Sequence, residues 1–290
     1  MNLARLLTVG FITGVITVSM NACSPTPEPE APSLPERTGV RLDSLGVGVG
    51  REENRPVSFT NKRSAYFYTQ THRNDHPEHA GFSGLNIAQR RAFSGYDVYV
   101  GGVRLDPELA EVTVYPDRME RRWANGATEV LRMLDQRDVI EIELAGAGED
   151  VQVVPLGEGV ALLGHQEGLR IYSTMEIPGR VVTAGRHGER HYLIVAESPT
   201  AALDGFQAAE TGAADWRGDR EQRLAGLLNR HTYVQADDPT LTSALRWLLI
   251  TMDQLVTRQR GEGIYAGLPW FNEYWGRDSF IALPGALLVT

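Results

Sequence analysis

The chain has 290 residues, of which 42% are hydrophobic and 22% charged, and this ordinary globular balance excludes wholesale disorder and fibrous repeats. The formal net charge is −9, so the chain lacks the basic field of nucleic-acid binders and we expect no nucleic-acid partner. A single cysteine, Cys23, excludes an internal disulfide and a cysteine zinc site.

Residues 1–22 have the pattern of a secretory signal peptide, with Arg5 followed by a mostly apolar stretch. The segment ends Met-Asn-Ala-Cys at Cys23, which resembles the lipoprotein box of bacterial signals, where a small residue precedes a lipidated cysteine. We therefore predict lipidation of Cys23 and an exported protein anchored by acyl chains to the bacterial cell envelope, at the outer membrane or the periplasmic face. The alternative is a plain signal peptide with an incidental cysteine.

Residues 23–56 are predicted to form a tether. Ser24 to Pro35 is acidic and rich in proline, a composition that cannot bury a core. The stretch up to Asn54 is polar and contains the sequence Gly-Val-Gly-Val-Gly at 46–50. It has no strand before it and no helix after it, so it is not a dinucleotide-binding loop and we expect it to be flexible.

From Val57 to Glu197 the pattern is that of many short strands separated by glycine turns, which predicts an antiparallel β-sandwich over 57–197. Residues 96–100 alternate, and Gly101-Gly102 then indicates a hairpin turn. In the strand Val139–Leu144, alternation places Glu141 and Glu143 together on the face opposite the isoleucines, and we expect both on the solvent side.

From Ser198 onward the sequence has the features of helices rather than strands. Ser198-Pro199 is typical of a helix start, and we predict a polar helical linker over 198–231 with a break at Thr211-Gly212. Asp238-Pro239 starts a second helix, whose apolar residues from Leu241 to Val256 recur at steps of three and four and predict a core-facing stripe. After an aromatic loop, a further helix is predicted to start at Ser279.

The loop between these last two helices carries the residues with the clearest chemistry. Four aromatic side chains lie within six residues: Trp270, Phe271, Tyr274 and Trp275. Aromatic rings suit the C–H faces of sugars, while Arg277 and Asp278 offer donors and acceptors for hydroxyl groups. The pattern therefore favours a sugar subsite. The alternative is that the aromatics pack a domain seam and Asp278 caps the next helix.

The sequence Gly-Leu-Pro-Trp-Phe at 267–271, with Trp-Gly-Arg-Asp-Ser-Phe-Ile-Ala-Leu-Pro-Gly at 275–285, resembles the start of the catalytic domain of glycogen-debranching enzymes of the amylo-α-1,6-glucosidase type. The resemblance implies that residues 232–290 begin an (α/α) toroid of six helical hairpins. It also implies that Arg277 and Asp278 bind a terminal glucose, with Trp270 and Trp275 as walls. The expected fold is thus α+β and multidomain, a β-sandwich followed by the start of a toroid.

The family mechanism is an inverting hydrolysis that uses a general acid and a general base. In the family both lie on later barrel loops, so we expect the catalytic residues beyond residue 290 and predict that the chain is the N-terminal part of a longer enzyme, inactive alone. One alternative is a truncated, non-catalytic lipoprotein whose β-domain binds glycans. Another is a related six-hairpin glycosidase with a different oligosaccharide substrate. No cofactor motif is present.

Three histidines, His72, His76 and His79, lie close together beside acidic residues, a composition that could hold a metal. Pro77 prevents a helix there, so the three cannot share a helical face. We interpret the segment as a polar loop, which could border the sugar cleft, and predict no metal site.

Overall fold

The computed structural model describes residues 39–230 and 236–284, so the predictions for the signal peptide and for Cys23 lie outside the described residues. The 3₁₀-helix η1 (Leu42–Leu45) and strand β1 (Val47–Val49) come first. Leu42 and Leu45 are buried against Leu224 and Leu228. The prediction that the stretch before Asn54 is flexible is therefore wrong for residues 42–49, because buried apolar side chains anchor them.

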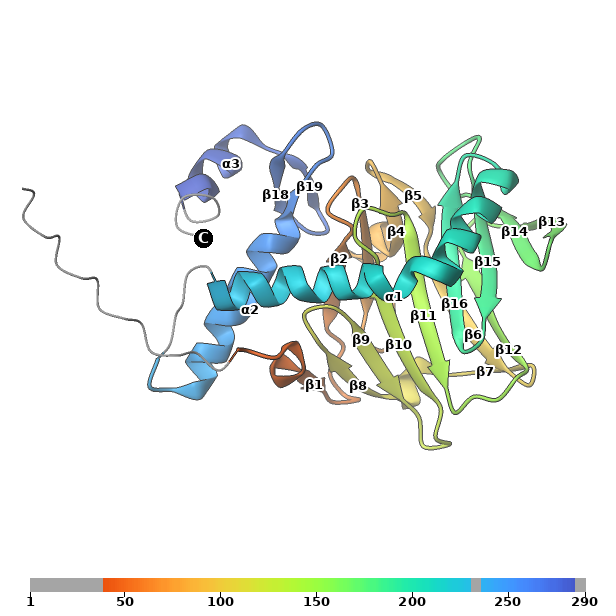
Figure 1. The fold of residues 1–290 in the computed structure, drawn as a ribbon, viewed down its shortest axis with the longest axis horizontal. Helices are drawn as coiled ribbons and strands as arrows, with labels where there is room; N and C mark the ends of the chain where they lie inside the picture. The colour runs from red at the N-terminus through yellow and green to blue at the C-terminus, as the bar shows by residue number, and fades with distance from the viewer. Residues whose placement is uncertain (1–38, 231–235, 285–290) are drawn as a thin grey trace, which may run out of the picture. The chain divides into compact units, whose positions relative to one another are not determined.

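The largest sheet is antiparallel and has nine strands, in the order β1-β8-β9-β10-β11-β16-β15-β14-β13 (Figure 1). Its other members are β8 (Glu111–Val114), β9 (Met119–Arg122), β10 (Thr128–Met133), β11 (Val139–Ala145), β13 (Leu162–Gln166), β14 (Leu169–Ser173), β15 (Val181–His187) and β16 (Arg190–Ala196). In β11, Ile140 and Ile142 alternate into the main core as their spacing predicts.

Two smaller antiparallel sheets complete this part of the chain. One contains β2 (Pro56–Thr60), β3 (Ala65–Gln70), β4 (Gly84–Ile87) and β5 (Arg90–Phe93); the other contains β6 (Gly95–Val100), β7 (Val103–Arg104) and β12 (Val151–Leu156). Phe67 and Val153 from these sheets share one hydrophobic core with Leu131 and Ile140 of the large sheet. This packing is consistent with the predicted β-sandwich. The hairpin between β6 and β7 turns through Gly101 and Gly102, as predicted.

Helix α1 (Pro199–Arg230) lies across the nine-stranded sheet (Figure 1). The hydroxyl of Ser198 accepts a hydrogen bond from the amide of Ala201 at 3.1 Å, which confirms the predicted helix start. The helix is continuous, so the predicted break at Thr211-Gly212 is wrong. Phe206 and Ala213 pack on Tyr192 and Ile194 of the sheet, and this packing outweighs the weak helix propensity of Gly212.

The expectation for Glu141 and Glu143 is also wrong. Glu141 is fully buried, and Glu143 is half-buried. The two side chains share a face of β11 as predicted, but α1 covers that face and brings Arg217 to 2.6 Å from Glu141. Arg132 of β10 contacts both carboxylates, at 3.4 Å and 3.0 Å. The acidic pair therefore belongs to a buried ion-pair network.

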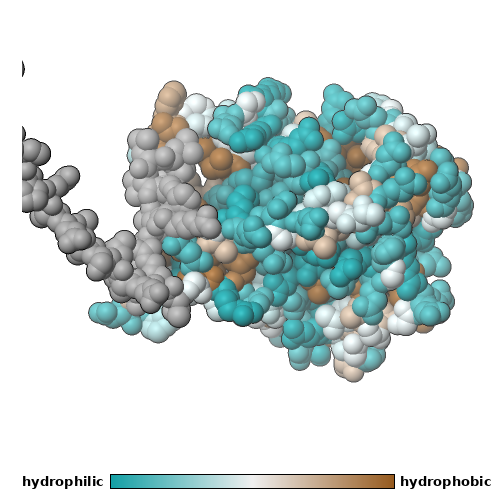
Figure 2. All heavy atoms as spheres, in the orientation of Figure 1, coloured by the Kyte–Doolittle hydropathy of each residue, from teal (hydrophilic) through white to brown (hydrophobic). Residues whose placement is uncertain are grey.

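Asp238 is the N-cap of helix α2 (Pro239–Leu255), as predicted: its carboxylate accepts a hydrogen bond from the amide of Thr240 at 2.8 Å. Its apolar stripe is only partly buried: Ile250 is in the core, whereas Leu241 and Leu248 are 49% and 59% exposed. The prediction of a core-facing stripe thus holds only for part of the helix. Figure 2 shows scattered brown, hydrophobic patches at both ends of the visible face, with a mostly hydrophilic surface between them.

After α2 the chain forms a small sheet of β17 (Val256–Thr257), β18 (Gly263–Gly267) and β19 (Phe271–Tyr274), followed by helix α3 (Gly276–Leu283). Within the described ranges, no helix is long and apolar enough to cross a membrane.

Candidate functional site

The predicted sugar-binding residues lie on the β18–β19 hairpin and the start of α3. The aromatic segment, expected as a loop, is therefore mostly a β-hairpin. Trp270 is in the turn between the two strands, and Trp275 immediately precedes α3. Both indole rings are about half exposed, at 48% and 47%. Exposed tryptophans held on a short hairpin can present flat apolar faces to a ligand.

The hairpin is held by side chains that lie between the two parts of the motif. The hydroxyl of Tyr274 donates to the carbonyl of Thr257 at 2.7 Å and accepts from the amide of Gln259 at 2.8 Å. The hydroxyl of Tyr274 therefore stabilises the hairpin by bonding the backbone at residues 257 and 259. The amide of Asn272 donates to the hydroxyl of Tyr66 in β3 at 2.8 Å, which ties β19 to the four-stranded sheet.

Arg277 and Asp278 lie in the first turn of α3, with a guanidinium nitrogen 3.3 Å from a carboxylate oxygen. The helix begins at Gly276, and the amide of Ser279 donates to the carbonyl of Trp275. Asp278 is therefore inside the first turn and is not the residue that caps the helix, so the capping alternative is wrong. The carboxylate lies where the helix macrodipole favours negative charge, and Arg277 is 77% exposed and able to reach a ligand.

The histidine loop borders this site. The ring of His79 meets the edge of Trp270 with a centroid distance of 4.8 Å, and His76 stacks on His79 at 4.2 Å. His72 does not join them: it is buried, and its Nδ1 lies 3.1 Å from the hydroxyl of Thr71. The structure therefore brings two of the three histidines to the predicted sugar site.

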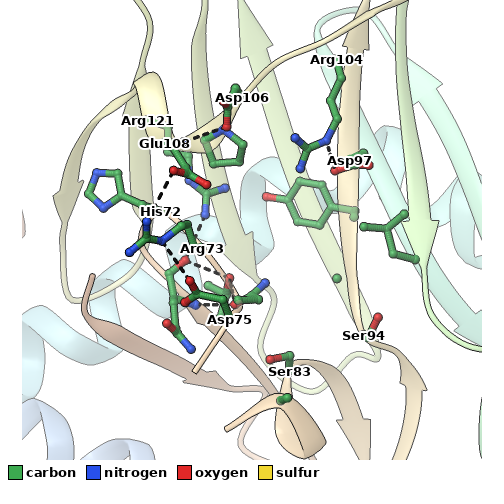
Figure 3. A pocket seen from close by; sticks show the side chains of 18 of the residues that line it. His72, Arg73, Asp75, Ser83, Ser94, Asp97, Arg104, Asp106, Glu108 and Arg121 are labelled. Carbon is green, nitrogen blue, oxygen red and sulfur yellow. Dashed lines mark hydrogen bonds and ion pairs between the residues drawn. The ribbon is translucent and has the colours of Figure 1, made fainter. Parts of the chain in front are cut away.

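A second concave feature lies in the β-domain. It is a cavity of about 510 Å³ between β3, the β6–β7 hairpin and the turn at 106–108. Figure 3 shows the Arg104–Asp97 ion pair, 2.7 Å apart, facing Arg73 with Asp75 and Glu108. Sequence reasoning missed this cavity because its walls come from segments that are distant along the chain.

Arg121 is buried in the wall of the cavity. Its Nη1 lies 2.8 Å from the Glu129 carboxylate, which also accepts from the hydroxyl of Tyr96 at 2.9 Å. Burial and the Glu129 charge raise the pKa of Tyr96 well above its usual range, so its hydroxyl stays a donor. Burial lowers the pKa of His72, assisted by the nearby Arg121, so this lining imidazole is neutral at pH 7.

The cavity can bind a small polar molecule. Its charged lining groups nearly balance: Asp75, Asp97, Asp106 and Glu108 against Arg73, Arg104 and Arg121. A balanced set gives little net attraction to an anion or a cation, but it offers many donors and acceptors. Such a lining suits hydroxyl groups, and the volume is within the usual range for small-molecule sites.

The C-terminal segment of the chain matches a known protein family. Residues 243–290, a small part of the chain, match the family model of a class of glycoside hydrolases. The matching family is described as amylo-alpha-1,6-glucosidase, so the resemblance of this segment to glycogen-debranching enzymes is confirmed. All four predicted sugar-binding residues lie in the matched segment. A comparison with curated proteins found no match.

Proposed function

We propose that the protein is a glycoside hydrolase of the glycogen-debranching type and that it binds an α-glucan at Trp270, Trp275, Arg277 and Asp278. The observation that carries this proposal is the position of these side chains within one hairpin and one helical turn, with the two indoles and Arg277 exposed. The family match to residues 243–290 supports the substrate class.

Each residue has a distinct role in this proposal. The indoles of Trp270 and Trp275 contact C–H faces of glucose rings, while Arg277 and Asp278 hydrogen-bond the hydroxyls of the terminal unit. Asp278 binds substrate and is not assigned to proton transfer, which inverting hydrolysis gives to two other carboxyl groups. In the same proposal, α2 and α3 are the first helices of an (α/α) toroid.

The test is calorimetric titration of the full chain with a maltooligosaccharide and, separately, with a cellooligosaccharide. We expect binding of the α-linked sugar and about tenfold weaker binding by Trp270→Ala and Asp278→Asn, a difference of about 1.4 kcal/mol. Asp215→Asn, at an exposed carboxylate of α1, is the matched control and should bind like the wild type. Equal affinity of all three variants for the α-glucan contradicts the assignment.

The cavity of the β-domain supports a second candidate function, in which that domain binds a glycan without hydrolysing it. Asp97→Ala removes the carboxylate that holds Arg104 in the cavity wall. If Asp97→Ala abolishes glucan binding whereas Asp278→Asn retains it, the glycan site is the cavity. The reverse result favours the hydrolase site.

We propose in addition that the protein is exported and lipid-anchored at Cys23, on the basis of the apolar N-terminal stretch that ends at the chain's only cysteine. Growth of an expressing bacterium with radiolabelled palmitate should label the wild-type protein. The Cys23→Ala variant should be unlabelled and released from the membrane fraction. Equal labelling of both proteins contradicts the anchor.

A further inference from the structure

The segment between His76 and Ala80 forms a tight turn on the β-domain. The amides of His79 and Ala80 both donate to the carbonyl of His76 at 3.0 Å. Pro77 occupies the second position of the turn, where its fixed φ is favoured. The proline that excludes a helix here therefore closes a turn that places His76 and His79 side by side.

The turn gathers three side chains that can bind a metal. His76, Glu78 and His79 each offer a ligand atom, and these atoms lie within 4.8 Å of one another. The two imidazole rings are stacked with centroids 4.2 Å apart. His76 and Glu78 are exposed, so their side chains can change rotamer and turn their ligand atoms toward a metal held by His79.

The donor set selects the type of metal. Two imidazole nitrogens and one carboxylate oxygen are ligands typical of Zn²⁺, with bonds of about 2.0–2.2 Å. Calcium and magnesium prefer oxygen ligands alone, which disfavours them at this turn. Three protein ligands leave the fourth tetrahedral position to water or to another molecule.

A neighbouring side chain fixes the orientation of one ligand. The hydroxyl of the buried Tyr68 lies 2.5 Å from Nδ1 of His79. Metal-binding histidines commonly hydrogen-bond through the nitrogen that does not hold the metal, and this arrangement leaves Nε2 of His79 for the metal.

We propose that His76, Glu78 and His79 form a zinc site, with Tyr68 as the residue that orients His79. The sequence alone predicts no metal here, because spacing does not reveal that the turn brings these side chains together. The site lies against Trp270, whose ring is 4.8 Å from that of His79. Bound zinc would therefore lie close to the C-terminal hairpin. The proposal does not depend on glucan binding.

The test is calorimetric titration of the metal-free full chain with zinc chloride. We expect one zinc ion per chain, and at least tenfold weaker binding by His76→Ala and by the His76→Ala/His79→Ala double variant. Tyr68→Phe keeps all three ligands but loses the orienting hydroxyl, so its affinity should fall by about 10–100-fold. His165→Ala, at an exposed histidine of β13, is the matched control and should bind like the wild type.

Circular dichroism of each variant confirms that the fold is intact. The double variant also separates this site from zinc bound elsewhere on the chain. The proposal is overturned if the wild type binds no zinc, or if the double variant titrates like the wild type. Unchanged affinity of Tyr68→Phe overturns the role of Tyr68.

Discussion

Arg217 of α1 reaches into the nine-stranded sheet and places Nη1 2.6 Å from Oε2 of Glu141 in β11. Glu141 is fully buried, and the Arg217 side chain is 16% exposed. A buried carboxylate is tolerated only when its charge is paired and its oxygens are hydrogen-bonded. This ion pair therefore fixes where α1 crosses the sheet, and α1 in turn leads toward the helices of the candidate site.

Arg217→Ala should destabilise the protein strongly. Breaking a buried ion pair costs about 3–5 kcal/mol when the remaining charge is left alone. Here Arg132 stays 3.4 Å from the Glu141 carboxylate, so we expect a smaller loss of about 2–3 kcal/mol. Urea unfolding monitored by circular dichroism measures the change. Arg122→Ala removes an exposed arginine from a surface pair with Glu120 and should cost less than about 1 kcal/mol.

The Tyr66–Asn272 hydrogen bond makes a separate prediction about the candidate glucan site. Tyr66→Phe removes the hydroxyl that accepts from Asn272 and so weakens the link between β19 and the four-stranded sheet. Since Asn272 is only half-buried, water can replace the lost partner and stability should fall by about 1 kcal/mol or less. If the proposed function holds, maltooligosaccharide affinity should fall about threefold, because Trp270 and Trp275 are less well placed. Tyr172→Phe, at another buried tyrosine, is the control.

Local patterns predicted the parts of the fold that local chemistry decides. The alternation of Ile140 and Ile142 gave the right strand, and Ser198 and Asp238 marked the starts of α1 and α2. The environment of Glu141 could not be read from its own strand, because the arginine that covers it lies on α1, far along the chain. Sequence alternation separates the two faces of a sheet but does not say whether a helix covers the second.

In the candidate site, too, the sequence predicts what neighbouring residues determine but not the contacts between distant residues. Trp270, Arg277 and Asp278 were found from a contiguous motif, and the structure keeps them on one hairpin and helical turn. The contact of His79 with Trp270 joins residues almost two hundred positions apart, and periodicity carries no information on such a contact. The proline in the histidine loop was a usable signal: it excludes a helix, but it also favours the turn that pairs the histidines.

His191 predicts how stability changes in acid. This buried residue of β16 has its pKa lowered from 6.5 to about 4 by burial, with further repulsion from Arg186 and Arg170. Between pH 6.5 and pH 4 the unfolded chain therefore binds a proton that the folded chain does not, and the free energy of unfolding falls as the pH falls. His191→Phe should reduce this fall by up to about 3 kcal/mol in urea unfolding. His165→Phe, at an exposed position, should show the wild-type pH dependence.

Lys62 predicts a change of stability at alkaline pH. It is the only lysine of the chain, and its ammonium group donates to the backbone carbonyl of Asp253 and lies 3.3 Å from its carboxylate. Burial lowers the pKa of Lys62 from 10.5 to about 8, although Asp253 opposes the shift. Because the folded pKa lies below the unfolded one, the unfolded chain holds more protons between pH 8 and pH 10.5. The free energy of unfolding should therefore rise with pH above 8.

The titration of Lys62 can be observed directly. Incorporation of ¹³C-lysine labels one side chain, so the Cε signal in an NMR titration should give a single midpoint near pH 8. Asp253→Asn removes the charge that favours the ammonium form and should move the midpoint lower still. In urea unfolding, Lys62→Met should abolish about 1–2 kcal/mol of the gain between pH 8 and pH 9.5. A midpoint near 10.5 in the wild type would show that the ammonium group is solvated, and the predicted gain in stability would then be absent.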